Sequence, residues 1–240
     1  MNNLFRLCVC LCCLAAWDSL CAADYTLTGV NTWNGSNTYT NADNLTLSDG
    51  TTINVTSNTA SSGRNGTDYY GNIYIAGNTS ATIVTNGSQS TILNGNLTGS
   101  GTLVKDGGAQ LHLDGDNTAF AGTIRVTNSW LSIYDSDATS ALATYEINSG
   151  MVFAYSTSEV SLGMLTGAGT VRPGEQLTPN SLTLKVGGAD LSGTFSGKLL
   201  DYRTTGGGVL KALSLEKVGT GTWILNTQAL STGELAPSGT

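Results

Sequence analysis

LTGSGTLVKDGGAQLHLDGDNTAFAGTIRV, residues 97–126, is the stretch from which a fold can first be predicted. Apolar residues alternate with polar ones in Leu111-x-Leu113 and Ile124-x-Val126, which is the period of a β-strand with one buried face. Glycines interrupt this alternation every few residues and mark turns. The stretch therefore predicts short strands joined by tight corners, and it has no helical period.

Two later segments repeat parts of this stretch. LEKVGTGTWIL, residues 215–225, repeats the pattern around Lys105, and LTGAGTV, residues 165–171, repeats LTGSGTL, residues 97–103. Recurrence of such units predicts a stacked repeat architecture. The matched pairs, which we interpret as structural repeat positions, are Lys105 with Lys217, Gly107 with Gly219, Leu111 with Trp223, and Leu113 with Leu225.

The chain contains few charged residues. Charged residues make up 11% of the 240-residue chain, against roughly 25% in an average globular protein. Gly, Thr, Ser and Asn take their place, while regularly placed Leu, Ile and Val distinguish the chain from a disordered one. A net charge of −7 without a basic stripe argues against nucleic acid as a partner. An uncharged polar surface suits an exported β protein.

The first 23 residues are predicted to be a signal peptide that is removed from the mature protein. A positive charge at Arg6 precedes an apolar run over residues 7–17, and Cys21-Ala22-Ala23 offers small residues for cleavage before Asp24. The apolar run is shorter than the roughly 20 residues that a membrane-spanning helix needs.

All five cysteines lie in this segment, at Cys8, Cys10, Cys12, Cys13 and Cys21. We interpret them as small apolar residues of the discarded peptide. Lipidation of Cys21 is the alternative, and Leu20 argues against it because a lipoprotein signal has a small residue at that position. The mature chain is then expected to have no disulfide framework and no thiolate chemistry.

The mature chain is predicted to consist of degenerate β-helix coils over residues 24–96 and of coils with the repeats over residues 97–240, which end in mid-coil. Residues 57–70 are predicted to form a surface loop. Pro173 and Pro179 are predicted to bracket another loop, since proline cannot donate within a β-ladder. Asn-Gly pairs, which accept positive φ, predict tight turns at residues 34–35, 65–66, 86–87 and 94–95.

Two all-β architectures fit such short strands. An antiparallel sandwich has turns about every 8–12 residues. We favour a parallel β-helix, a solenoid, because the strands are very short, glycine and asparagine stand at corners, and the repeats recur at spacings of several coils. In that fold Leu, Ile and Val point inward and stack, while Thr, Ser and Asn form polar ladders outside.

The pattern Leu103-x-Lys105-x-Gly107-x-x-x-Leu111-x-Leu113-x-Gly115, followed by Asn117-Thr118-x-Phe120-x-Gly122-Thr123, resembles the autotransporter-associated β-strand repeat of bacterial passenger domains. A second copy, over residues 191–235, is similar to the same repeat. The resemblance implies a right-handed parallel β-helix that is displayed at the outer surface of a Gram-negative cell.

In that family a C-terminal β-barrel exports or tethers the passenger. We expect this chain to be a fragment, a truncated product or a short secreted relative without its own translocator barrel. The resemblance implies an outer-membrane translocator or another cell-surface component as a partner, with extracellular glycans or a host surface as further candidates. The expected location is the cell surface, the outer membrane or the extracellular space.

Candidate chemistry is sparse. His112, the only histidine, is close in sequence to Asp114 and Asp116, and alternation places these residues on the outward face of a strand and its turn. One histidine with two loosely placed carboxylates is not a zinc set, so we interpret the group as a solvated outward face. The pairs Asp114 with Asp116 and Asp135 with Asp137 are interpreted as turn caps rather than as paired catalytic carboxylates.

The leading hypothesis is a non-enzymatic, exported, surface-associated β-helix passenger with a structural or adhesin-like role, without catalytic, cofactor-binding or metal-binding residues. The alternative is a polysaccharide-binding or polysaccharide-cleaving β-helix, in which Trp33, Trp130 and Trp223 form a sugar platform. The match with Leu111 instead predicts that Trp223 fills an inward position. Seven Asn-x-Ser/Thr triplets are attributed to composition rather than to glycosylation; they start at Asn34, Asn44, Asn54, Asn65, Asn78, Asn86 and Asn96.

Overall fold

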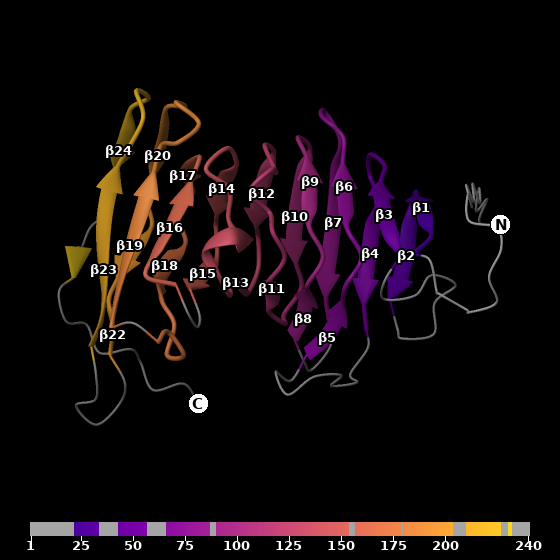
Figure 1. Cartoon of the computed structure of the whole chain (residues 1–240), viewed down its shortest axis with the longest axis horizontal. Coiled ribbons are helices and arrows are strands. Elements are labelled where there is room, and N and C mark those ends of the chain that lie inside the picture. The colour runs from indigo at the N-terminus through magenta and orange to yellow at the C-terminus, as the bar shows by residue number, and fades with distance from the viewer. Residues whose placement is uncertain are drawn as a thin grey trace, which may run out of the picture.

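The computed structural model describes residues 22–33, 43–56, 66–86, 90–153, 157–178, 180–203, 210–226 and 230–231. These residues form coils stacked along one rod, with the N-terminal strands at one end and the C-terminal strands at the other (Figure 1). Pairing is parallel throughout the described strands, except where β22 (Tyr202–Arg203) lies antiparallel to β23 (Leu210–Lys217). The predicted parallel β-solenoid is confirmed, and the antiparallel sandwich is excluded.

The strands of the described residues belong to sheets that we name A to E. Sheet A contains β1 (Asp24–Leu27), β3 (Asn44–Leu47), β6 (Ile73–Ile75) and β9 (Leu97–Gly99). Sheet B contains β2 (Val30–Trp33), β4 (Thr52–Val55), β7 (Ser80–Thr85), β10 (Thr102–Asp106), β12 (Thr123–Val126), β14 (Thr144–Ile147) and β17 (Met164–Thr166).

Sheet C is the longest stack. It contains β5 (Gly66–Tyr69), β8 (Ser90–Leu93), β11 (Leu111–Leu113), β13 (Trp130–Ile133), β15 (Gly150–Phe153), β18 (Thr170–Pro173), β21 (Lys198–Leu200) and β25 (Leu230–Ser231). Sheet D contains β16 (Glu159–Leu162), β19 (Ser181–Val186), β23 and β22, and sheet E contains β20 (Gly193–Phe195) and β24 (Trp223–Leu225). A short 3-10 helix, η1 (Ser136–Ala138), precedes β14.

The targeting segment predicted for residues 1–23 lies outside the described residues, apart from Ala22 and Ala23. Within the described ranges, no helix has the length and apolar character that a membrane crossing requires.

The middle of sheet C repeats with a period of twenty residues. Thr91, Leu111, Leu131, Met151 and Val171 pair in register, and each residue number exceeds the previous one by 20. The four apolar members of this column are fully buried in the core of the solenoid. Regular coils therefore place like side chains directly above one another, and the inward column excludes water along the whole stack.

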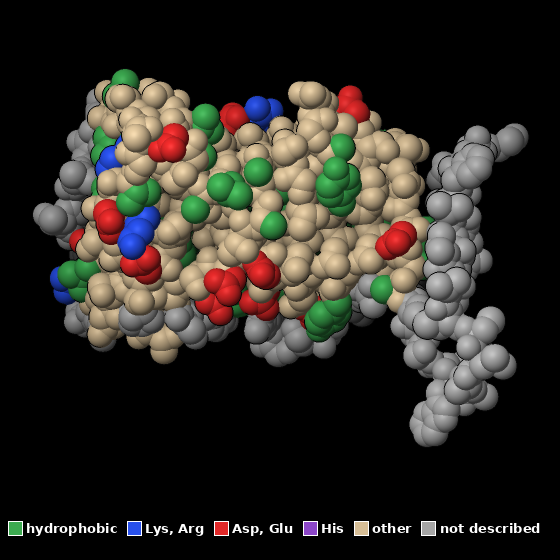
Figure 2. Space-filling view, turned by 45° about the horizontal axis from the view of Figure 1, so that its top comes forward, with side chains coloured by type: hydrophobic (Ala, Val, Ile, Leu, Met, Phe, Trp, Pro, Cys, Tyr) green, Lys and Arg blue, Asp and Glu red, His purple; other side chains and the backbone are tan. Residues whose placement is uncertain are grey.

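Uncharged polar side chains dominate the outward positions on the face of the rod that Figure 2 shows. Strand burial alternates as predicted, for example in β7, where inward Ala81, Ile83 and Thr85 are buried and the residues between them are partly exposed. Figure 2 shows a face made largely of backbone and uncharged polar side chains, with few Lys, Arg, Asp or Glu residues. The predicted separation of apolar interior from polar exterior is confirmed.

Asparagine side chains link successive coils at one corner. The Asn44 Oδ1 accepts from the Asn72 backbone N–H at 3.0 Å, the Asn72 Oδ1 accepts from Asn96 N–H at 2.9 Å, and the Asn96 Oδ1 accepts from Asp116 N–H at 3.0 Å. Each amide thereby satisfies a corner N–H of the next coil, a group that would otherwise lack a partner within the sheets. Asn44 and Asn96 also start two of the Asn-x-Ser/Thr triplets, so the ladder gives these asparagines a structural role.

A column of glycines, each directly before a residue of this ladder, makes the same corner thin enough to stack. A Cβ added to Gly71 would overlap the Asp43 carbonyl, one on Gly95 would overlap the Gly71 carbonyl, and one on Gly115 would overlap the Gly95 carbonyl. None of these glycines has a positive φ. The chain therefore turns at Asn94-Gly95, as predicted. The glycine is required there because two backbones approach closely, and not because the residue adopts the left-handed conformation that the prediction assumed.

Two other loop predictions differ from the structure. Residues 57–65 lie outside the described residues, but the end of the predicted surface loop is the strand β5, in which Tyr69 is fully buried against Trp33 with ring centroids 4.4 Å apart. Its sequence GTDY offers a single large inward residue, so alternation could not reveal the strand. Pro173 is not in a loop either, since it is the buried last residue of β18; Pro179 lies outside the described residues.

Replacing Gly95 by alanine is expected to lower the free energy of unfolding by about 3 kcal/mol, because the new Cβ must push two stacked coils apart. Urea denaturation followed by circular dichroism measures this change. Gly108→Ala is the matched control, since nothing lies within 4 Å of its added Cβ. Equal midpoints for the two variants would contradict the role of the glycine column.

Candidate functional site

Lys105 occupies an inward position in sheet B. It stands in register between Ile83 and Val126, so its aliphatic stem continues an apolar column, and the residue is 0% exposed. Its Nζ donates to the carbonyls of Asp106 at 3.1 Å, Gly107 at 2.7 Å and Asn128 at 2.9 Å. The three donors of the ammonium thus serve three corner carbonyls from two coils.

Lys217 repeats this arrangement in another sheet. It ends β23 in sheet D, in register with the inward Val186, and its Nζ donates to the carbonyls of Val218 at 2.5 Å and Gly219 at 3.0 Å. Gly107 and Gly219 have positive φ values of 86° and 66°. Each lysine therefore contacts the carbonyls one and two residues later, beside a left-handed glycine. Both lysines thus donate to backbone carbonyls at a corner.

The repeats share local geometry but not a face of the solenoid. Leu111 lies in sheet C, whereas its match Trp223 lies in sheet E. The segments LTGSGTL and LTGAGTV show the same shift: Gly99 ends a strand of sheet A and Gly167 follows a strand of sheet B, with φ values of 99° and 102°. The matched copies therefore lie on different sheets of the solenoid. The motif specifies a corner between two strands, and different corners use it.

The exposure of matched residues also differs. Leu111 and Leu113 are fully buried, while Trp223 is partly buried against the core and Leu225 is 38% exposed. The indole N–H of Trp223 donates to the Leu165 carbonyl at 2.9 Å. The predicted inward position of Trp223 is confirmed. Trp33 is buried too, so of these three tryptophans only Trp130 points outward from its sheet.

His112 is not solvated, contrary to the prediction. It does point outward from β11, but it is 7% exposed because the Tyr134 ring covers it, with ring centroids 4.9 Å apart. Sequence alternation gives the face of a residue correctly but cannot show whether neighbouring coils cover that face. No group of three His, Cys, Asp or Glu side chains able to hold a metal ion occurs in the described part of the chain.

One aspartate of each pair, Asp116 and Asp135, caps a turn. The Asp116 Oδ1 accepts from the Thr118 N–H at 3.1 Å and from the Thr118 hydroxyl at 2.5 Å, which lowers the pKa of the Asp116 carboxyl. Asp135 is the N-cap of η1, and its Oδ1 accepts from the Ser136 N–H at 2.6 Å. The prediction of turn caps is confirmed for these two residues.

The outward face of sheet C carries the candidate site. His112, Ser132, Val152 and Arg172 stand in register on β11, β13, β15 and β18, so they form a straight row across neighbouring coils. Around this row a groove of about 280 Å³ opens, and we name it the sheet C groove. Its lining residues are Gln110, His112, Trp130, Ser132, Tyr134, Val152, Arg172, Gly174, Glu175 and Gln176.

One wall of the groove is a stack of planar groups. The Arg172 guanidinium carbon lies 5.0 Å from the Trp130 ring centroid and 4.7 Å from that of Tyr202. Trp130 can lie across the sheet because its neighbour Gly150 has no side chain; an added Cβ there would overlap the indole. Burial lowers the pKa of the Arg172 guanidinium, an effect that Tyr202 and Glu175 oppose. Stacking between two aromatic rings fixes the guanidinium in place.

Ser132 and Gln110 also line the groove. The Ser132 hydroxyl donates to the Gln110 Oε1 at 3.3 Å, and Ser132 is 3% exposed. Glu175 and Gln176 are exposed on the turn after β18, which the Leu177 N–H closes by donating to the Gly174 carbonyl at 3.2 Å. Sequence reasoning missed this groove. The spacing of twenty residues between 112, 132, 152 and 172 is the signal that could have revealed it.

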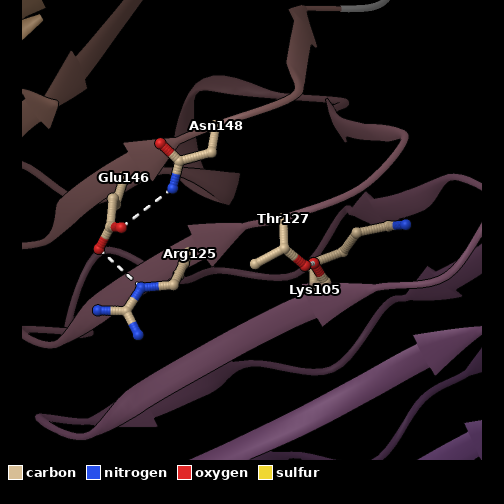
Figure 3. A network of polar contacts seen from close by, with 5 residues as sticks. All are labelled: Lys105, Arg125, Thr127, Glu146 and Asn148. Atoms are coloured by element: carbon tan, nitrogen blue, oxygen red, sulfur yellow. Dashed lines mark hydrogen bonds and ion pairs between the residues drawn. The ribbon is translucent and has the colours of Figure 1, made fainter. Parts of the chain in front are cut away.

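A second row of polar side chains, on sheet B, has the geometry of a structural ladder. Arg125 and Glu146 stand in register on β12 and β14, and the Arg125 Nε lies 2.7 Å from the Glu146 Oε2. The Asn148 side-chain amide donates to the Glu146 Oε1 at 3.0 Å. Figure 3 shows this chain of contacts, with the Lys105 side chain directed away from it beside Thr127. Arg125 and Glu146 in this row pair with each other.

Comparisons of the chain with known protein families, with curated proteins and with solved structures each find no match. The functional interpretation therefore rests on the geometry of the groove and on the sequence patterns described above.

Lys105→Met is expected to lower the free energy of unfolding by about 2 kcal/mol at pH 7, because methionine keeps the stem but leaves three corner carbonyls without a donor. Thermal or urea denaturation measures the change. Lys217→Met is the control, since this lysine lies at an exposed corner, and it is expected to change stability by less than about 0.5 kcal/mol. An unchanged stability in Lys105→Met would contradict the bridging role.

The stability of the wild-type chain is expected to rise between pH 8 and 10.5 relative to Lys105→Met. Burial lowers the pKa of Lys105 from 10.5 to about 8, while Asp106 raises it. In this window the unfolded chain holds the proton and the folded chain has released it, so the unfolded state binds more protons and stability increases with pH. The increase is on the order of 3 kcal/mol. Urea denaturation at several pH values tests it; a difference that stays constant with pH would refute the shift.

Proposed function

We propose that this chain is a non-enzymatic, exported solenoid that works at a cell surface in a structural or adhesin-like role. The observation that carries the proposal is the continuous stack of coils, with its apolar interior and its largely uncharged polar exterior. A rod of stacked coils keeps its outer face in a fixed position relative to both ends. A structural or adhesin-like role of this kind requires no moving part. The repeat pattern around Lys105 and the predicted signal peptide support export to the surface.

Cleavage of polysaccharides is the less favoured alternative. Most glycoside hydrolases flank the scissile bond with two carboxyl groups. Among the described residues that line the sheet C groove, Glu175 is the single carboxylate. Asp116 and Asp135 are engaged in capping turns. The groove therefore supports binding better than catalysis.

Expression of the full chain in a Gram-negative bacterium is expected to yield a product that begins at Asp24 and that external protease digests on intact cells. N-terminal sequencing and protease accessibility measure these properties. The control carries Leu11→Arg and Leu14→Arg, which place charges in the apolar run and should hold the chain inside the cell. A wild-type chain that stays inside the cell with its N-terminal segment intact would overturn the proposal of export.

Purified chain is expected to release no sugars from polysaccharides in a reducing-end assay. Turnover that disappears in Asp114→Asn or Asp137→Asn would refute the non-enzymatic role and favour the alternative.

A further inference from the structure

We propose that the sheet C groove is a binding site for a neutral saccharide of one or two rings. This inference rests on the proposed function and deepens it, because it names the ligand class that a surface-displayed solenoid would hold on its outer face.

The groove exists because small residues interrupt a row of large ones. Ser132 and Val152 occupy the middle of the outward row, and Gly150 and Gly174 have no side chains. The large lining residues form two pairs in contact, Trp130 with Arg172 and His112 with Tyr134. Neighbouring strands lie about 4.8 Å apart, so the three steps from β11 to β18 span about 14 Å. That length and the volume of about 280 Å³ suit a small saccharide rather than a folded partner.

The walls are already fixed in place. Trp130 lies over Gly150, and Arg172 is held between Trp130 and Tyr202 at 5.0 and 4.7 Å. Tyr134 packs against His112 at 4.9 Å. A ligand entering this groove therefore orders few side chains, which reduces the entropic cost of binding.

The groups around the groove match the chemistry of a sugar. Aromatic rings pack against the apolar C–H faces of a pyranose, and planar amide, carboxylate and guanidinium groups form paired hydrogen bonds with neighbouring hydroxyls. Trp130 supplies a partly exposed ring, and Gln110, Glu175 and Gln176 supply the planar polar groups. A few convergent polar groups beside aromatic side chains are the usual composition of a small-ligand site.

Charge selects a neutral ligand. Arg172 and Glu175 both line the groove, so one positive and one negative group balance there. The chain as a whole has a net charge of −7, which repels acidic polysaccharides and nucleic acids. An extended peptide cannot add to the sheet here, because β11, β13, β15 and β18 are paired on both sides and offer no free edge.

Titration of the purified chain with neutral and with acidic oligosaccharides tests the proposal, with tryptophan fluorescence and calorimetry as readouts. Neutral sugars are expected to bind and to perturb the emission of Trp130. The double variant Glu175→Ala with Gln176→Ala removes two exposed planar groups and should weaken binding about tenfold. Because Glu175 also contacts Tyr202, the single variant Gln176→Ala is measured beside it and should weaken binding without altering the urea midpoint. Val152→Trp, which fills the groove, should abolish binding. Tyr74→Ala, an exposed aromatic change on sheet A, should leave affinity unchanged.

Absence of neutral sugar binding, binding of acidic sugars alone, or binding that persists in Val152→Trp would each overturn the groove proposal. None of these outcomes changes the result of the export experiment, so each proposal can be refuted without the other. A chain that binds neutral sugars through the groove but is not exported would refute the proposed surface role while supporting the ligand.

Discussion

Close contact between backbones at the corners is the constraint on which the rest of the structure depends. A carbonyl from one coil lies where the Cβ of the next would be, at Gly71, Gly95 and Gly115. Because these corners are thin, the strands on either side can approach to hydrogen-bonding distance and the inward columns can close. The asparagine ladder satisfies backbone N–H groups at the same corner, so tight packing there leaves few groups without partners.

At other corners, backbone carbonyls accept hydrogen bonds from the ammonium group of a lysine. A corner with a left-handed glycine turns its carbonyls toward the core, and Lys105 brings an ammonium to them along an otherwise aliphatic column. The cost of burying this charge appears in its lowered pKa. The same local contacts recur at Lys217 in another sheet, so the arrangement belongs to the corner sequence and not to a particular position in the rod.

Alternation and glycine spacing were sufficient to predict the solenoid, because the period of two and the corner residues are local properties. These patterns failed to predict strands and burial where side chains of neighbouring coils determine them. Asp68 and Tyr69 belong to β5, a strand whose sequence shows hardly any alternation, because Tyr69 alone fills the space beside Trp33. His112 is buried by Tyr134 of the next coil. The groove joins His112 to Arg172, residues that come together only once the length of every intervening coil is known.

The placement of matched corners on different sheets has a consequence for how such a chain can lengthen. Gly99 and Gly167 have nearly equal conformations, yet one leaves sheet A and the other leaves sheet B. A duplicated segment therefore need not equal a whole number of coils; a single strand with its corner fits at any side of the cross-section. A duplication shorter than one coil can thus extend the rod, and it places the copied side chains on a different face of the solenoid.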